Sequence, residues 1–127
     1  LSLSDLKLKE NIVTLDTKVI LNKVLQLRPV SFKWLDNLDN EKRRGKKDEG
    51  LIAQEVEEVW PMLVDEMETF EDDHEKIKYI HYNKLSVYMA GAIQEQQKEI
   101  VELRNENNML KEQMKNVLER LVALESK

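Results

Sequence analysis

The chain of 127 residues has no cysteine, only two histidines, two prolines and three glycines. The absence of cysteine excludes disulfide bonds, thiolate zinc sites and thiol nucleophiles, although it leaves the redox compartment undetermined. There is also no Gly-rich phosphate loop and no pair of metal ligands at a recognisable spacing. We therefore expect no cofactor, no metal and no small-molecule substrate.

Long apolar runs are missing as well. No stretch approaches the length of a membrane span, and the N-terminus lacks the basic and then apolar pattern of a signal peptide, so we expect no membrane partner. The net charge of −5 should repel nucleic acid. The basic run Lys42–Lys47 is the exception, but the Asn, Asp and Gly residues around it indicate a solvated loop tip. We therefore expect no nucleic-acid partner.

The most informative feature that is present is a seven-residue repeat near the C-terminus. With Ile93 as position a, apolar residues recur every 3.5 residues, the period that winds helices around one another. The predicted seam residues are Ile93, Ile100, Leu103, Asn107, Leu110, Met114, Val117, Leu121 and Leu124, and Met89 and Gln96 occupy the first two d positions. The repeat predicts a coiled-coil stalk over residues 83–127.

Charges beside the seam predict how the helices run. In a parallel coil, position g of one chain meets position e of the next heptad in its neighbour. These pairs are Glu99 with Arg104, Glu106 with Lys111, and Arg120 with Glu125, all of opposite sign. Asn107 at an a position is typical of dimers, whereas Leu118 at an e position widens the apolar stripe toward three strands. We favour a parallel homotrimer; the alternative is a single amphipathic helix that covers a monomeric core.

About eighty residues precede this helix, enough for one small domain with a thin stability margin. The predicted fold class is α+β, with a mixed strand and helix head over residues 1–82 and the stalk over residues 83–127. Such a head would gain from sharing a core with sister subunits, so we expect folding and assembly to be one event. The abrupt start suggests a fragment of a longer protein.

Local patterns predict the elements of the head. Apolar residues at helical spacing after Asp16 predict a short helix that ends at Pro29, with Asp16 or Thr17 available as its cap. The next expected elements are a strand over 30–34, a loop or hairpin tip over 36–49, a strand over 50–53, a helix over 54–59 and alternation over 76–82. In the last of these, Ile77, Tyr79 and His81 are expected on one face, and Asn83 can cap the terminal helix.

The stretch 65–75 is rich in carboxylates. An acidic cluster can hold calcium, but Asp72, Asp73 and Glu75 lack the spacing and the central glycine of a calcium loop. We therefore interpret this stretch as a solvated acidic segment.

Ser4 and Lys9 lie close together in the segment Ser4-Asp5-Leu6-Lys7-Leu8-Lys9. A serine hydroxyl is a weak nucleophile until a base takes its proton, and a lysine in a desolvated site can be that base. Ser–Lys pairs recur as hydrolytic sites. A serine near a lysine is nevertheless commonplace, and on spacing alone a polar strand or a helix cap accounts for the segment better.

Several motifs, in this order along the chain, resemble the peptidase S74 family. They are Ser4-Asp5 with Lys9-Glu10-Asn11-Ile12, Leu27-Arg28-Pro29-Val30-Ser31-Phe32, Gly50-Leu51-Ile52-Ala53-Gln54-Glu55-Val56, Trp60-Pro61, and Tyr82 at the start of the heptad helix. The family comprises C-terminal intramolecular chaperone domains of phage endosialidase tailspikes, tail fibres and neck appendages, and occurs in myelin regulatory factor. The resemblance covers nearly the whole chain.

The resemblance implies a trimeric domain that brings three copies of an upstream fibre into register and then cuts itself off. Carried over to this chain, it makes Ser4 the nucleophile, Lys9 its base and Leu3–Ser4 the scissile bond. The supporting motif residues are then Asp5, Asn11, Gln54 and Glu55. The implied partners are sister chains and the upstream fibre or appendage domain of the same polypeptide. The implied location is the host cytoplasm during phage assembly, and the domain is then released from, or stays part of, the virion tail or appendage.

One departure from the family pattern concerns a histidine that members often carry shortly before the Gly-x-Ile-Ala-Gln-Glu element. This chain has Lys46, Lys47, Asp48 and Glu49 there, so it lacks a histidine at the place where the family pattern would put an accessory one. Two alternatives stay open. One is a structural trimerisation cap in which Ser4 and Lys9 are bystanders, and the other is the self-cleaving module of a membrane-released transcription factor. The sequence upstream of Leu1 would discriminate between a fibre and a regulator.

Overall fold

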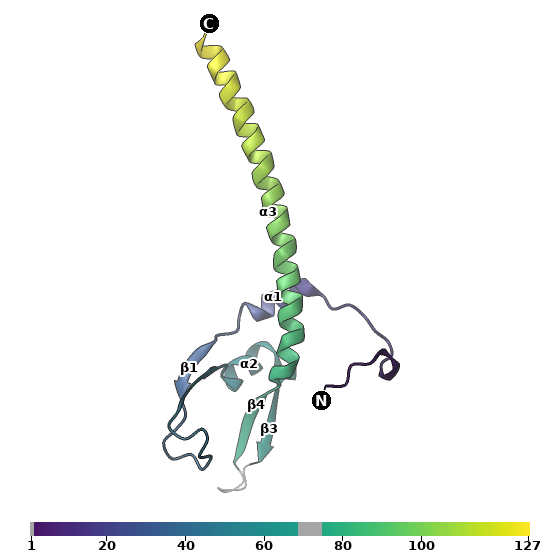
Figure 1. Cartoon of the computed structure of the whole chain (residues 1–127), viewed down its shortest axis with the longest axis vertical. Helices are drawn as coiled ribbons and strands as arrows, with labels where there is room; N and C mark the ends of the chain where they lie inside the picture. Colours follow the sequence, from purple (N-terminus) through teal and green to yellow (C-terminus); the bar gives the residue numbers. More distant parts are fainter. Residues whose placement is uncertain (1, 69–74) are drawn as a thin grey trace.

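The computed structural model describes residues 2–68 and 75–127, which form a small head on one long helix (Figure 1). The elements in chain order are η1 (Leu6–Leu8), α1 (Thr17–Val24), β1 (Val30–Lys33), β2 (Lys47–Gly50), α2 (Ala53–Val59), η2 (Pro61–Leu63), β3 (Val64–Glu68), β4 (Lys76–Ile80) and α3 (Tyr82–Glu125). This mixed head and long C-terminal helix are consistent with the predicted α+β class.

Of the two candidate caps, Asp16 is the N-cap of helix α1, which begins at Thr17. The Asp16 carboxylate accepts hydrogen bonds from the backbone N–H groups of Lys18 at 3.0 Å and Val19 at 3.3 Å. Such a cap typically stabilises a helix by about 1 kcal/mol. Ile20 and Leu21, on the inner side of α1, are buried.

The strands form two separate antiparallel hairpins, β1–β2 and β3–β4. The strand expected over 50–53 was placed too late, because β2 ends at Gly50, which pairs with Val30. Strand β3 lies in the carboxylate-rich stretch, where composition predicted no strand. In both cases the side chains are mostly polar and exposed, so hydrogen bonding to the partner strand, rather than an apolar pattern, defines the element.

The β3–β4 register places Met67 opposite Ile77, and Asp65 opposite Tyr79. These four side chains share one face of the hairpin, because opposite residues of an antiparallel pair point the same way. This face is exposed, whereas Val64 on the other face is buried. Asp72, Asp73 and His74 lie outside the described residues. Among residues 2–68 and 75–127, no group of three acidic or histidine side chains is placed to hold a metal ion.

The basic run lies at the end of the connection between β1 and β2, and its last residue, Lys47, begins β2. Arg44 donates to the backbone carbonyls of Leu38 at 2.5 Å and Asp39 at 3.2 Å, and the Arg43 guanidinium lies 5.1 Å from the centre of the Trp34 ring. Two of the five basic side chains are therefore engaged in folding their own loop.

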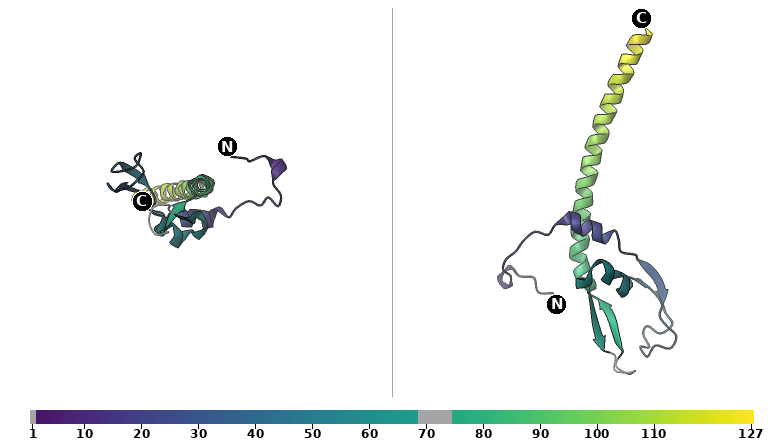
Figure 2. Two further views of the ribbon diagram at one scale, coloured as in Figure 1. Left: turned by 90° about the horizontal axis from the view of Figure 1, so that it is seen from below. Right: turned by 180° about the vertical axis from the view of Figure 1, so that it is seen from behind.

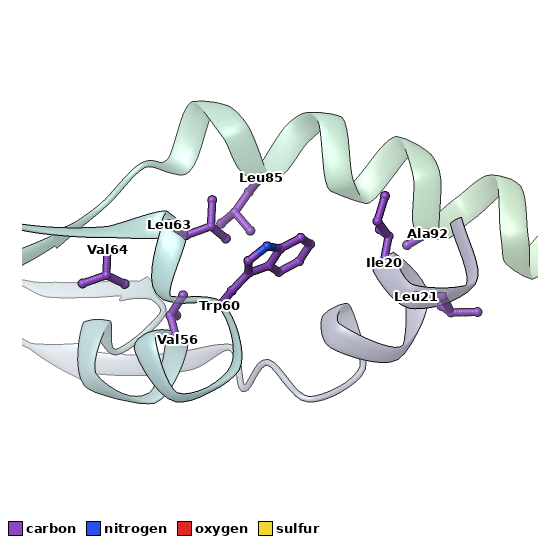
Figure 3. Close-up of a cluster of buried hydrophobic side chains, with 8 residues drawn as sticks. All are labelled: Ile20, Leu21, Val56, Trp60, Leu63, Val64, Leu85 and Ala92. Carbon is purple, nitrogen blue, oxygen red and sulfur yellow. The ribbon is translucent and has the colours of Figure 1, made fainter. Parts of the chain in front are cut away.

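A small apolar core joins the head to α3. Its buried members are Ile20, Leu21, Val56, Trp60, Leu63, Val64, Leu85 and Ala92. Figure 3 shows Trp60 between the group from α1 and the group around Leu63, and its ring stacks on Tyr88 of α3 with centroids 3.9 Å apart. Of these eight side chains, only Val56 and Leu63 are fully enclosed, so the described head has little apolar burial with which to stabilise itself alone.

Helix α3 begins one residue before the predicted cap. His81, not Asn83, is the N-cap residue, and its backbone N–H donates to the Leu63 carbonyl at 2.8 Å. This contact fixes the junction between β4 and α3, and it places Asn83 inside the first turn. The tertiary bond therefore decides the start of the helix, and a local side-chain cap does not.

The two halves of α3 differ in burial. Its first turns pack on α1 and η2, whereas every residue from Gln96 to Lys127 is exposed as the helix projects from the head (Figure 1). The projecting half therefore covers no core of its own chain, contrary to the single-helix alternative. Within residues 2–68 and 75–127, no helix combines the length and the apolar character needed to cross a membrane.

Candidate functional site

Ser4 and Lys9 meet at a short turn near the N-terminus. The Lys9 Nζ donates to Ser4 Oγ over 2.7 Å. In an extended chain, five residues would separate their Cα atoms by about 17 Å, so a turn is needed to bring the two side chains together. The 3₁₀ turn η1 (Leu6–Leu8) does this. The pair lies within the distance at which a general base takes a proton.

Asp5 organises this turn. Its Oδ1 accepts from the Lys7 backbone N–H at 2.8 Å, and its carbonyl accepts from the Leu8 N–H at 3.0 Å. The Lys9 N–H then donates to the Leu6 carbonyl at 3.1 Å. Beyond Lys9, Asn11 has a φ of 53°, a left-handed conformation that asparagine adopts more readily than most residues. Two of the predicted supporting residues therefore shape the backbone on either side of Lys9.

The segment that carries the Ser4–Lys9 pair is an open arm. Every residue from Ser2 to Asp16 is exposed, and the apolar side chains of Leu3 and Val13 are 82% and 81% exposed. The arm leaves α1 on the side of α3 opposite the β1–β2 hairpin (Figures 1 and 2). The head of the same chain therefore does not cover the pair.

The other two predicted supporting residues lie on α2, away from the arm (Figure 1). Glu55 forms a two-point ion pair with Arg28, with Arg28 Nε 2.9 Å from Oε1 and Arg28 Nη2 2.7 Å from Oε2. These hydrogen bonds lower the pKa of the Glu55 carboxyl from its usual value. Gln54, next to it, is exposed. The structure therefore gives Glu55 a role in joining α2 to the chain before β1.

Gly50 and Tyr82, from two separate motifs, also meet. The Tyr82 hydroxyl accepts from the Leu51 backbone N–H at 2.9 Å, and a Cβ atom on Gly50 would lie 2.9 Å from the same oxygen. This close approach explains why a residue without a side chain stands at position 50. Sequence reasoning missed the contact because 31 residues separate Leu51 from Tyr82.

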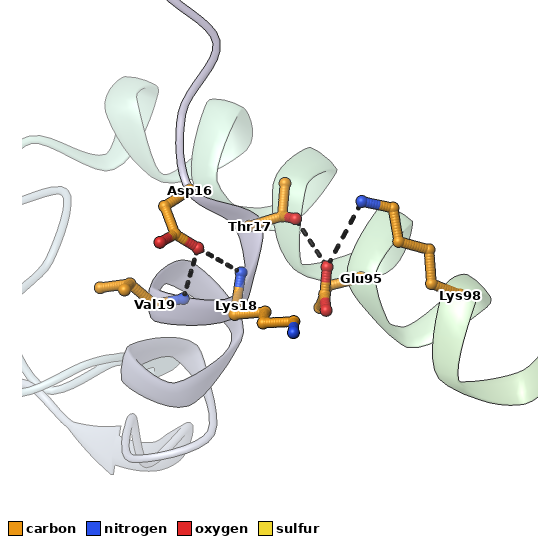
Figure 4. A network of polar contacts seen from close by, with 6 residues as sticks. All are labelled: Asp16, Thr17, Lys18, Val19, Glu95 and Lys98. Carbon is orange, nitrogen blue, oxygen red and sulfur yellow. Dashed lines mark hydrogen bonds and ion pairs between the residues drawn. The ribbon is translucent and has the colours of Figure 1, made fainter. Parts of the chain in front are cut away.

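A polar contact anchors the root of the arm. The Thr17 hydroxyl, at the start of α1, donates to Glu95 Oε2 of α3 at 2.6 Å, and Lys98 Nζ lies 3.7 Å from that oxygen (Figure 4). The Glu95 side chain is 4% exposed, and its contacts with Thr17 and Lys98 offset the cost of burying its carboxylate. The contact is a second feature that sequence reasoning missed.

The nine predicted seam residues from Ile93 to Leu124 all lie on α3 and are exposed in the single chain; Ile93, for example, is 65% exposed. Met89, the first d position of the repeat, is instead half-buried against the core of the head. Helix α1 covers a different flank, where a Cβ atom on Gly91 would lie 3.3 Å from Ile20. The seam is therefore left open by the fold of the head.

Comparison with known families gives a match over the first part of the chain. Residues 4–65, which begin at Ser4, match the Peptidase_S74 family model, described as the chaperone of endosialidase. The predicted resemblance is therefore confirmed over this segment. The family is thus one of intramolecular chaperones of the endosialidase type, and its name is that of a peptidase.

A solved structure supports the fold. It is described as "Crystal structure of a novel intramolecular chaperon", and the match has a TM-score of 0.54 and 18% identity. The match covers 76% of this chain and 99% of that one. At this identity the likeness concerns the fold alone. No curated protein matches the chain.

Proposed function

We propose that this chain is an intramolecular chaperone that assembles as a parallel homotrimer, registers an upstream phage fibre or appendage domain, and then cuts itself off at Leu3–Ser4. The observation that carries the proposal is the 2.7 Å contact between Lys9 Nζ and Ser4 Oγ at the start of the family match. The proposed location is the host cytoplasm during phage assembly and, afterwards, the virion tail or appendage.

The position of Ser4 defines the chemistry. Its hydroxyl belongs to the residue just after the scissile bond, so Oγ attacks the neighbouring Leu3 carbonyl carbon. A neutral Lys9 amine takes the proton from Oγ and returns it to the Ser4 nitrogen as the C–N bond breaks, which leaves Leu3 esterified to Oγ. Water then hydrolyses the ester and yields a Leu3 carboxylate and a free Ser4 hydroxyl and amine.

Proximity supplies much of the acceleration in this proposal. The nucleophile and the carbonyl belong to adjacent residues, and well-oriented intramolecular reactions gain up to about 7–11 kcal/mol from proximity. No substrate has to be bound, and one turnover per chain suffices.

Assembly gates the reaction because the arm is open in one chain. A lysine amine that accepts a proton must be uncharged, and burial against a neighbouring copy favours the uncharged form. The exposed apolar residues of the arm, such as Leu3 and Val13, supply surface for that burial. Cleavage therefore follows trimer formation.

The chaperone activity is mainly entropic. Pairing of the open seams brings three upstream chains together and raises their effective concentration. Slow three-body nucleation of a fibre then becomes an intramolecular event. The head, with its small core, folds together with this assembly.

The proposal is tested on a chain extended at its N-terminus and followed by mass spectrometry. The natural residues should give a product that begins at Ser4. Ser4→Ala and Lys9→Ala should leave the chain uncut and trimeric, because neither residue lies in the seam. Lys9→Arg keeps the positive charge but holds its proton, so it should also stay uncut. Normal cleavage of the Lys9→Arg chain would remove Lys9 as the base.

A purely structural trimerisation cap is the second candidate. The complete exposure of residues 2–16 favours it, because the arm plays no part in the core of the head. In that case the extended natural chain forms a trimer by sedimentation equilibrium but keeps its full mass. A protein that stayed monomeric would contradict both candidates.

A further inference from the structure

We propose that Asp5 is a positioning residue that folds the turn between Ser4 and Lys9, and that its negative charge takes no part in the cleavage. The inference rests on the proposed self-cleavage. Two mechanisms can be written with Ser4, Asp5 and Lys9. In one, Asp5 is a third catalytic member that acts on Lys9 through its charge. In the other, Asp5 acts only through the backbone.

The contacts of Asp5 favour the backbone role. Its Oδ1 hydrogen-bonds to the Lys7 N–H at 2.8 Å, and its φ and ψ of −66° and 135° are those of a capping residue. Lys9 Nζ, in contrast, donates to Ser4. Within residues 2–68 and 75–127, no ion pair joins Asp5 to Lys9.

The backbone bonds of Asp5 explain how the turn presents the two reacting groups. The Asp5 carbonyl accepts the Leu8 N–H at 3.0 Å, and this bond closes the first turn directly after Ser4. The next bond, from the Lys9 N–H to the Leu6 carbonyl at 3.1 Å, fixes the backbone of Lys9 itself. The carboxylate holds the middle of this turn by satisfying the Lys7 N–H, which would otherwise be an unpaired donor of the 3₁₀ turn. Loss of the cap should therefore lower the fraction of chains in which Lys9 reaches Ser4.

Four substitutions at one position separate capping from charge. Asp5→Asn and Asp5→Ser remove the charge but keep a good N-cap, Asp5→Glu keeps the charge on a side chain that is not a preferred cap, and Asp5→Ala removes both. Single-turnover cleavage of the extended trimer should proceed at nearly the natural rate for Asn and Ser. It should be about tenfold slower for Ala and Glu, which corresponds to about 1.4 kcal/mol, within the range for a lost cap.

The pH dependence of the cleavage rate distinguishes the two roles, because loss of a cap does not change its midpoint. A charge that acts on Lys9 would shift the midpoint of the profile in Asp5→Asn, whereas a cap would not. The inference is overturned if Asn and Ser are as slow as Ala while Glu keeps the rate, or if the midpoint moves in Asp5→Asn.

A second readout does not depend on cleavage. The Lys7 backbone amide can be followed by NMR in the uncut Ser4→Ala chain, with the same four changes at Asp5. Asn and Ser should keep the hydrogen-bonded chemical shift of this amide, and Ala and Glu should lose it. If the natural extended chain is not cut but this pattern holds, the proposed function fails while the capping role of Asp5 stands. If the pattern is absent, the capping role fails in either case.

Discussion

The motif residues of the head are engaged in contacts within the chain, whereas those of the arm are exposed. In the head, Arg28 pairs with Glu55 and Gly50 lies against Tyr82. The Trp60 ring contacts the ring of Tyr88. These motif residues therefore hold the chain to itself. In the arm, Ser4 and Lys9 contact each other but are exposed. The head motifs therefore build a scaffold, whereas Ser4 and Lys9 are left uncovered by residues 2–68 and 75–127 of their own chain.

The same contrast runs along α3. One flank of its first turns is covered by α1, while the seam that continues past Gln96 is open. If arm and seam are both open for a neighbour, then disrupting the seam should affect the whole molecule. Disrupting a contact within the head should affect the head first.

The largest effect is expected from Leu103→Asp with Leu110→Asp. Each change puts an uncompensated charge into the predicted seam and should cost several kcal/mol of trimer stability. Sedimentation equilibrium should report a monomer, and the melting temperature of the head should fall with it. The matched control is Asn105→Asp with Asn108→Asp, which adds the same charge off the seam and should stay trimeric. A double seam variant that keeps its trimer and its melting temperature would show that head and stalk are not coupled.

Leu63→Ala should give the next largest effect, within the head. Leu63 has 0% exposure, and removal of a buried leucine side chain typically costs about 2–5 kcal/mol of unfolding free energy. The neighbouring Met62, 73% exposed, is the control, and Met62→Ala should cost less than about 0.5 kcal/mol. Urea denaturation measures both. Equal losses would mean that Met62 is buried in the assembled protein.

Gly50→Ala tests the close approach of two head motifs. The new Cβ would lie 2.9 Å from the Tyr82 hydroxyl oxygen, so overpacking should cost about 1–3 kcal/mol. Tyr82→Phe removes that oxygen, together with its hydrogen bond from the Leu51 N–H. The double variant should therefore be more stable than the sum of the two single changes predicts. Additive losses would show that the hydroxyl is not the atom that excludes a side chain at position 50.

The smallest effect is expected at the exposed pair of Arg28 and Glu55. The hydrogen bonds from Arg28 lower the pKa of Glu55 in the folded protein, so the pair contributes stability above the unfolded pKa of about 4.3 and loses it as the pH falls through the folded value. Glu55→Gln should therefore have a lower melting temperature than the natural chain at pH 7. The difference should shrink below about pH 4. A gap that is constant over this range would mean that the charge of Glu55 does not stabilise the fold.

Local chemistry made several features predictable. Asp16 caps α1 because an N-cap needs only a short side-chain acceptor beside free amides, which adjacent residues reveal. The terminal helix follows from its period. The turn that joins Ser4 to Lys9 spans six residues, so both members of the pair lie within one sequence motif. The hydrogen bonds that fold this turn could not be predicted from the spacing of the two residues.

Features that depend on distant partners could not be predicted. Strands β2 and β3 are polar, and only pairing with β1 and β4 makes them strands. The start of α3 at Tyr82 depends on the bond between the His81 N–H and the Leu63 carbonyl. The Thr17–Glu95 contact joins residues 78 positions apart.

The amino-acid sequence by itself determined the chemistry and the periodicity: a hydroxyl beside an amine, a capping carboxylate, and a heptad stripe with paired charges. These are local properties, because each involves side chains within a turn or two of one another. Only the tertiary structure decided which surfaces are used and which are left open. Packing of α1 on one flank of α3 leaves the seam exposed, and the direction in which the arm leaves α1 keeps Ser4 and Lys9 clear of their own head. Burial depends on where distant segments meet, which no local pattern records.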